Sequence, residues 1–260
     1  MHVRAPAVAG LFYDADPGLL QHHVEELVSA VSAEAQPCPR ALVVPHAGYA
    51  YSGAIAAAAY ARLRQRERPI RRVALFGPAH RVYLEGMAVP AADAFATPLG
   101  NIPLDTAGMA RLAGLPQVRV SDAAHREEHS LEVQLPFLQA VLGDFSLVPV
   151  VVGRCDPDSV AAAMDCVWQE PDTLLVVSTD LSHFHRYGVA CRQDARTCQR
   201  LLDREHSLVS EDACGAQALN GLMCTARGRT LEMELIAMCN SGDTAGDRGR
   251  VVGYGAFSLH

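Results

Sequence analysis

The chain has 260 residues, with 22 Lys and Arg against 29 Asp and Glu, and a formal net charge of −7. Half of the residues are hydrophobic and one fifth are charged, which is typical of a soluble globular protein and excludes the disordered and fibrous classes. The mild negative charge, without any run of Lys or Arg, argues against nucleic acid or an anionic membrane as the main partner.

The N-terminal residues 1–17 contain no long apolar stretch and include Asp14 and Asp16, so no signal peptide is predicted. The long uncharged stretch at 41–61 is interrupted by proline and glycine, which favours a strand, a turn and a helix over a membrane span. The eight cysteines are scattered and form no CxxC pair. We therefore expect reduced thiols and a cytoplasmic location.

Short β-branched or aliphatic runs that end in turn residues predict buried strands at 41–45, 72–77, 145–153, 173–178 and 251–259. Helical patterns lie between them: one after a cap at Ser52, and others at 130–142, 157–167, 189–202, 213–226 and 230–239. Pro136 indicates a kink or a late start in the helix at 130–142, and Asp156 can cap the helix at 157–167. The alternation predicts one α/β domain over 1–260, a three-layer sandwich with helices on both faces of a largely parallel or mixed sheet.

Three of the predicted strands run directly into turns that carry histidine. They lead to His46 in VVPHAGYAYSG, to His80 in LFGPAH, and to His183 and His185 in VVSTDLSHFH. Ligands of open parallel sheets bind outside the carboxyl ends of the strands. We therefore expect His46, His80 and His183 to converge on one crevice.

Neutral imidazole is a common metal ligand, but two histidines need a third, anionic ligand to hold a divalent ion well. Asp180, Glu128, Asp243 and several cysteines are candidates, although none has the spacing of a zinc finger or an HExxH helix. A histidine at a strand end is also often a hydrogen-bonded structural residue. From the pattern alone, the metal-binding and structural roles of His46 and His80 remain alternatives.

Six segments together resemble the Memo family, whose bacterial and archaeal members are often labelled AmmeMemoRadiSam system protein B. They are VAGLFY at 8–13, PHAGYAYSG at 45–53, GPAH at 77–80, EEHSLEVQLPFL at 127–138, STDLSHF at 178–184 and NSGD at 240–243. This family is similar to the class III non-haem iron extradiol dioxygenases (LigB-like). The resemblance implies an α/β sandwich with a metal pocket at the strand ends, and His46 and His80 as metal ligands.

The same resemblance places Asp243 at or next to the third ligand position, where animal Memo proteins have a cysteine. Two histidines and a carboxylate favour Fe(II), with Cu or Zn as alternatives. Asp243 can instead be a turn residue of the loop at 240–249. Cys214 is the rival third ligand and would favour Cu or Zn, but it can also be a small buried side chain that lines the pocket.

By resemblance, His183 is the acid/base histidine of the pocket, and Asp180 can hydrogen-bond an imidazole and fix its tautomer. Asp180 can also be the cap of a helix that begins near His183. His129 and Glu128 are expected to line the pocket, although Glu128 and Glu132 can equally belong to a solvated helix face. Further candidates for the pocket wall and the core are Tyr49, which can supply a hydroxyl or an aromatic surface, and Tyr51, for which core packing is expected.

These features predict a metal-dependent, dioxygenase-like oxidoreductase acting on a small organic substrate. The alternative is a binding or adaptor module that uses the same pocket for a peptide or a partner protein. Zinc-dependent hydrolysis with the same ligands is a third reading. The resemblance also implies association with AMMECR-family and radical-SAM proteins.

Overall fold

A nine-stranded sheet forms the centre of the molecule in the computed structural model, which describes residues 2–32, 37–66 and 68–260. Its four middle strands are parallel and lie in the order β2 (Ala41–Val44), β9 (Thr173–Ser178), β3 (Arg72–Pro78) and β8 (Ser146–Val152). Because these strands are parallel, their carboxyl ends meet at one edge of the sheet. The three histidine-bearing turns predicted from the sequence therefore begin at this common edge.

Both flanks of the sheet contain antiparallel pairs. Next to β2 lies the antiparallel β12 (Val251–Leu259), which also pairs with β11 (Met233–Asn240) and β10 (His183–His185). On the other side, β4 (Met87–Val89) is antiparallel to β8 and parallel to β7 (Val118–Val120). The sheet is thus mixed, with a parallel centre, as predicted.

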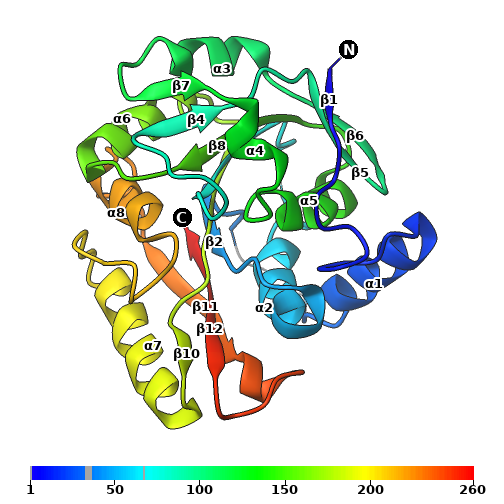
Figure 1. Ribbon diagram of the computed structural model, residues 1–260, viewed down its shortest axis with the longest axis vertical. Helices are drawn as coiled ribbons and strands as arrows, with labels where there is room; N and C mark the ends of the chain where they lie inside the picture. The colour runs from blue at the N-terminus through cyan, green and yellow to red at the C-terminus, as the bar shows by residue number, and fades with distance from the viewer. Residues whose placement is uncertain (1, 33–36, 67) are drawn as a thin grey trace.

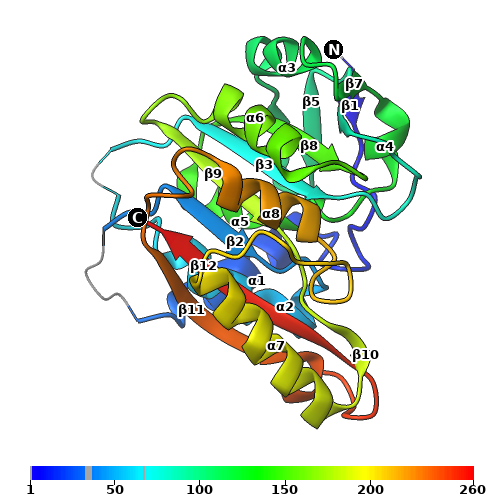
Figure 2. The ribbon, with the colours of Figure 1, turned by 90° about the vertical axis from the view of Figure 1, so that its left-hand side faces the viewer.

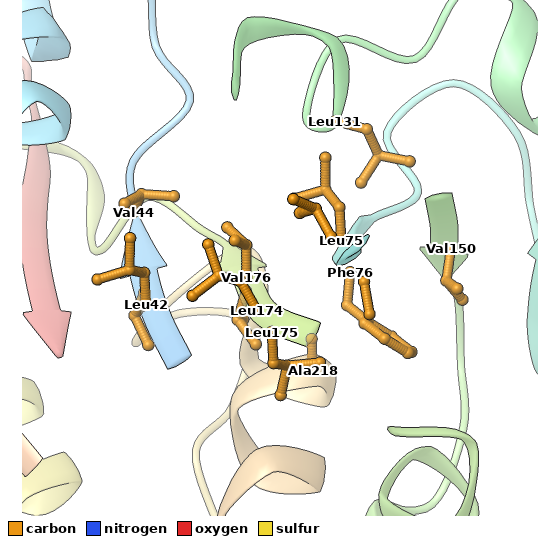
Figure 3. Packing of buried hydrophobic residues seen from close by; sticks show 14 of the residues in the cluster. Leu42, Val44, Leu75, Phe76, Leu131, Val150, Leu174, Leu175, Val176 and Ala218 are labelled. Atoms are coloured by element: carbon orange, nitrogen blue, oxygen red, sulfur yellow. The ribbon is translucent and has the colours of Figure 1, made fainter. Parts of the chain in front are cut away.

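The middle strands are buried along their length, because helices cover both of their faces. Leu42, Val176 and Leu75 are register partners on β2, β9 and β3, and all three are fully buried. Figure 3 shows these side chains with Val150 of β8 and with Ala218 from the helical layer. This continuous aliphatic core holds the carboxyl ends of the strands at fixed positions.

Helices form the two outer layers (Figures 1 and 2). One face is covered by α1 (Pro17–Ser29), α2 (Tyr49–Ala61) and α5 (Leu135–Leu142), and the other by α6 (Pro157–Val167), α7 (Tyr187–Leu202) and α8 (Ala216–Cys224). The predicted three-layer α/β sandwich is therefore confirmed. In the described part of the chain, no helix combines the length and apolar character needed to cross a bilayer.

A small second sheet lies beside the main one and was not predicted. Its strands are β1 (Val3–Arg4), β5 (Ala94–Thr97) and β6 (Gly100–Pro103), with β5 in the middle. Short elements complete the fold: α3 (Thr106–Ala113), α4 (Asp122–Arg126) and the 3₁₀ turns η1 (Glu132–Gln134) and η2 (Ser241–Asp243). The pairing of β1 with β5 holds the N-terminal segment against the body of the protein.

Two expected helix starts are confirmed. Pro136 lies in the first turn of α5, which begins late at Leu135, and Asp156 caps α6 by accepting a hydrogen bond from the Ser159 backbone N–H at 2.8 Å. The predicted cap at Ser52 is wrong, because α2 already begins at Tyr49 after Gly48.

The helix predicted at 230–239 is also wrong. This segment is strand β11, which pairs with β12 from Met233, opposite Leu259, to Asn240, opposite Gly253. Its apolar residues fit a helix locally, but backbone pairing along the long neighbouring strand β12 determines its conformation.

Candidate metal centre

Three histidines meet at the carboxyl edge of the parallel strands. His46 follows β2, His80 follows β3, and His129 lies in the loop between α4 and η1. Each offers one ligand nitrogen, and the three atoms lie within 4.8 Å of one another. The structure thus brings His46 and His80 together, as predicted, and adds His129, which was expected only as a pocket residue.

Hydrogen bonding determines which nitrogen of His46 carries the proton. The Ser178 hydroxyl donates to the Ser130 carbonyl at 2.6 Å, so the same oxygen must accept from His46 Nδ1, which lies 2.9 Å away. Gln134 Nε2 donates to that hydroxyl oxygen as well, at 2.9 Å. His46 is therefore protonated on Nδ1, and its lone pair lies on Nε2.

The carboxylate of Glu128 orients His80 in the same way. Its Oε1 accepts from His80 Nδ1 at 2.9 Å, and its Oε2 accepts from the His80 backbone N–H at 2.6 Å. Burial alone would raise the pKa of Glu128, but the hydrogen bonds and charge of His80 and the Ser130 N–H lower it to about 2. Glu128 is therefore an ionised, 2% exposed carboxylate, so a solvated helix face is the wrong interpretation. Nδ1 of His80 thus faces Glu128, and Nε2 is the nitrogen of this imidazole that can bind an ion.

His129 contributes a buried nitrogen that lacks a hydrogen-bond partner. Among the described residues, its Nδ1 makes no hydrogen bond and lies 3.6 Å from Glu128 Oε1. Burial is the main cause that lowers the pKa of His129 to about 4. Burial is also the largest cause that lowers the pKa of His46, and the neighbouring His80 and His129 add to it. These imidazoles are therefore neutral near pH 7, the form that coordinates metals.

This donor set fits a transition-metal ion. Imidazole nitrogens suit Zn, Cu, Fe and Ni. A hydrogen bond from Nδ1–H to a protein acceptor, as His46 and His80 make, is typical of metal-binding histidines. His46 is buried, whereas His80 is exposed. The group can therefore hold an ion whose coordination sphere remains open on the side of His80.

Cys214 lies next to this group, just before α8. Its Sγ is 3.3 Å from His46 Nε2 and accepts a hydrogen bond from the Asp180 backbone N–H at 3.2 Å. Burial, assisted by the nearby Asp180 carboxylate, raises the pKa of this thiol to about 12. Cys214 thus lies beside the histidine group, and its thiol can donate to the Nε2 lone pair of His46.

Asp243 is not part of the histidine group that forms among the described residues. Its Oδ1 accepts from the Tyr187 hydroxyl at 2.6 Å, and its Oδ2 accepts from the Asn240 backbone N–H at 3.1 Å. With Asn240 it forms a capping box at η2. One oxygen therefore takes part in the local turn and the other binds Tyr187 of α7, and the group contains His129 where Asp243 was expected.

Asp180 and His183 differ from the expected pair. Asp180 Oδ1 accepts from the His46 backbone N–H at 2.8 Å, so this carboxyl positions the main chain of a candidate ligand. Burial raises the pKa of Asp180 to about 7. His183 lies in β10 and not at a helix start, so the interpretation of Asp180 as a cap there is wrong.

The backbone, not Asp180, determines the tautomer of His183. Its Nδ1 lies 2.8 Å from the Leu181 carbonyl, which can only accept, so Nδ1 carries the proton. Burial is the largest cause that lowers the pKa of His183, against the opposing effect of this hydrogen bond. The imidazole is therefore neutral near pH 7, with a lone pair on Nε2.

The two tyrosines that follow His46 lie in different environments. Tyr49 is buried, its hydroxyl donates to the Val133 carbonyl at 2.9 Å, and its ring centroid lies 4.8 Å from that of Phe137. Tyr51 is 42% exposed, so the core position expected for it is wrong. Tyr49 therefore supports α2 below the histidine group.

Sequence reasoning missed the ligand position of His129 because no strand ends beside it. The loop reaches the group by folding over the end of β3, where the Ser130 hydroxyl donates to the Pro78 carbonyl at 2.9 Å. The available signal was the polar sequence EEHS directly before an apolar helix.

Comparisons with known proteins agree with this architecture. The model of the family described as Memo-like protein matches residues 4–258. The MEMO1 family protein of Methanopyrus kandleri is 36% identical, with 98% of each chain covered. A MEMO1 family protein of Aquifex aeolicus is 33% identical, also with 98% of each chain covered.

Among solved structures, the uncharacterized protein JW3007 of Escherichia coli K12 matches with a TM-score of 0.56 and 14% identity. The match covers 84% of this chain and 98% of that one, and it concerns the fold alone. The family match spans the strands, the histidine turns and the loop of His129. The chain therefore belongs to the Memo-like protein family.

Proposed function

We propose that this protein is a metal-dependent oxidoreductase whose resident ion is held by His46, His80 and His129, with the Cys214 sulfur as a fourth ligand. The observation that carries the proposal is the fixed tautomer of two of these histidines. Ser178 and Glu128 accept hydrogen bonds from the two Nδ1 atoms, so Nε2 is the ligand atom of both imidazoles. Such anchoring orients ligands before an ion binds.

The nature of the donors bears on the metal. The expectation of Fe(II) depended on a carboxylate, whereas the group here contains imidazoles and an adjacent thiol. Imidazole and thiolate suit copper, iron and zinc, and only the first two support electron transfer. A bound ion would supply a Lewis acid and a redox centre on the open side beside His80.

His183 is the proposed proton acceptor of the reaction. Its protonated Nδ1 faces the Leu181 carbonyl, and its neutral Nε2 can take a proton from a substrate hydroxyl and return it later. The lowered pKa of His183 keeps the acceptor neutral near pH 7. The substrate class is therefore a small organic molecule that carries an ionisable hydroxyl.

Metal content tests the ligand set. After anaerobic purification, Fe, Cu and Zn are quantified in the wild type and in His46→Ala, His80→Ala and Cys214→Ser. We expect loss of metal in both histidine variants and weaker retention in Cys214→Ser. Asp243→Asn is the matched control and should keep wild-type metal content. Wild-type metal content in both histidine variants would remove the proposed site.

Oxygen consumption with catechol-type substrates tests the chemistry. We expect turnover by the metal-loaded wild type and at least a 100-fold loss in His183→Ala, a size typical of a general acid or base. Metal binding without turnover, together with peptide binding, would favour the adaptor function. Hydrolysis that needs zinc but no oxygen would favour the hydrolase.

A further inference from the structure

The N-terminal strap, defined as residues 3–13, crosses the loop that carries Glu128 and His129. Arg4 of this strap is buried, and its guanidinium binds the end of α4, the loop and the first residue of η1. Nε donates to the His125 carbonyl at 2.8 Å, and Nη2 donates to the Glu128 carbonyl at 2.7 Å. Nη1 donates to Glu132 Oε2 at 2.5 Å, so one planar guanidinium joins the end of α4, the loop and the start of η1.

Glu132 completes this attachment from the side of the loop. Its side chain is fully buried and accepts from four donors. Besides Arg4, these are the backbone N–H groups of Ala7 at 2.7 Å and Val8 at 2.9 Å, and the Tyr13 hydroxyl at 2.6 Å. The acceptor sites of the carboxylate are thus filled by the strap alone.

Phe12 brings the strap into direct contact with the histidine group. Its ring centroid lies 4.8 Å from that of His129. Its carbonyl accepts from the backbone N–H of Tyr49, the first residue of α2, at 2.8 Å. The strap therefore touches one candidate ligand and also the helix that follows another, His46.

We infer that Arg4, Glu132 and Phe12 are positioning residues of the metal centre. This inference rests on the proposed function. The loop at 127–131 lies between α4 and η1 without regular helix or strand, and the side chains of Arg4, Glu128 and Ser130 make hydrogen bonds that support it. Arg4 holds the loop segment from which Glu128 orients His80 and on which His129 lies. The positions of both His80 and His129 thus depend on the guanidinium of Arg4.

Removing one partner of a buried ion pair leaves an uncompensated charge, so the test changes both. The variants are the double substitution Arg4→Met with Glu132→Gln, and separately Phe12→Ala. Arg72→Met is the matched control, because Arg72 pairs with Asp105 at 2.6 Å at the opposite end of β3 from His80. The probe is Co(II), titrated into the metal-free full-length protein and followed by its visible absorption.

We expect the double variant and Phe12→Ala to bind Co(II) 10- to 100-fold more weakly, with an altered absorption spectrum, while circular dichroism reports a folded chain. Arg72→Met should lose stability but keep the wild-type affinity and spectrum. If the double variant does not fold, Phe12→Ala and Arg4→Lys decide, since lysine keeps the charge but not the three-point fork.

Wild-type affinity and spectrum in the folded strap variants would overturn the inference. If His80→Ala abolishes Co(II) binding in that case, the proposed metal site still stands. If the wild type itself fails to bind Co(II), the proposed function fails and the inference fails with it.

Discussion

Ser178 and Glu128 have the same effect on two different histidines. Each accepts the Nδ1 proton of an imidazole and leaves its Nε2 as the available ligand atom. The two acceptors differ in strength, because Glu128 is charged and Ser178 is a neutral hydroxyl. The orientation of His80 should therefore depend more strongly on its partner than the orientation of His46 does.

Glu128→Gln tests this difference. The neutral amide keeps the shape of the side chain but loses the charge-assisted bond to His80 Nδ1, so we expect metal affinity to fall by about 10- to 100-fold. Ser178→Ala should cause a smaller loss. Competition with a chromophoric chelator measures both affinities. Equal affinities in Glu128→Gln and the wild type would show that His80 needs no anchor.

Whether the role of a single residue could be predicted depends on its local chemistry. His46 and His80 were predicted because each directly follows a strand whose direction the pattern revealed. The resemblance to the Memo family implied Asp243 as a ligand, because it lies shortly before the last strand. Its oxygens instead take part in the capping box of η2 and a bond to Tyr187, which depend on the folded turn. The position of Asp243 in the sequence could not reveal these hydrogen bonds.

Among the elements, α8 depends on a close approach to the end of β9. A Cβ at Gly215 would lie 2.7 Å from Thr179 Cβ and 2.9 Å from the Ser178 carbonyl oxygen. Cys214 directly precedes this glycine, and its backbone N–H donates to the Asp180 carbonyl at 3.2 Å. The position of the thiol beside His46 therefore requires a residue without a side chain at the start of the helix.

Gly215→Ala should destabilise the protein by about 1–3 kcal/mol, because α8 must move away from β9 to relieve the overlap. The same movement should withdraw Cys214 from His46 and weaken metal binding. Urea denaturation measures the first effect and metal titration the second. Gly18→Ala in α1 is the control, since its Cβ meets only the flexible Asp16 carboxylate, at 3.3 Å. An unchanged denaturation midpoint for Gly215→Ala would contradict the argument.

The elements also show why β11 and the small sheet were harder to predict than the parallel centre. Strands such as β9 are fully buried, with an unbroken apolar run in the middle, so their pattern has one interpretation. The residues of β11 are mostly half-buried and lie between α2 and α7 and beside β12. Their apolar spacing fits a helix as well, and only pairing with β12 decides between the two. The small sheet of β1, β5 and β6 has strands too short to give a pattern.

For the whole molecule, buried neutral histidines should make stability depend on pH. His125 is 2% exposed, and its Nε2 lies 3.0 Å from the Ala88 carbonyl. Burial is the main cause that lowers its pKa from 6.5 to about 4. Between these values the unfolded chain binds a proton that the folded chain does not. Stability should therefore fall as the pH decreases from about 6.5 to about 4.

The shift at His125 corresponds to a loss on the order of 3 kcal/mol across that range. His125→Gln can still donate to the Ala88 carbonyl. In this variant the slope of the unfolding free energy against pH should fall by the amount that corresponds to the binding of about one proton. Denaturant titrations of the metal-free protein at several pH values measure this slope. The same slope in the variant and the wild type would show that His125 does not contribute.

The three histidines belong to segments that are far apart in the chain and meet only in the folded state. An ion shared by them would act as a reversible cross-link between the turn after β2, the turn after β3 and the loop before η1. Unfolding would have to open this cross-link, so the free energy of ion binding would add to the resistance of the whole chain to heat and proteases. A chelator would then lower the melting temperature without changing any covalent bond.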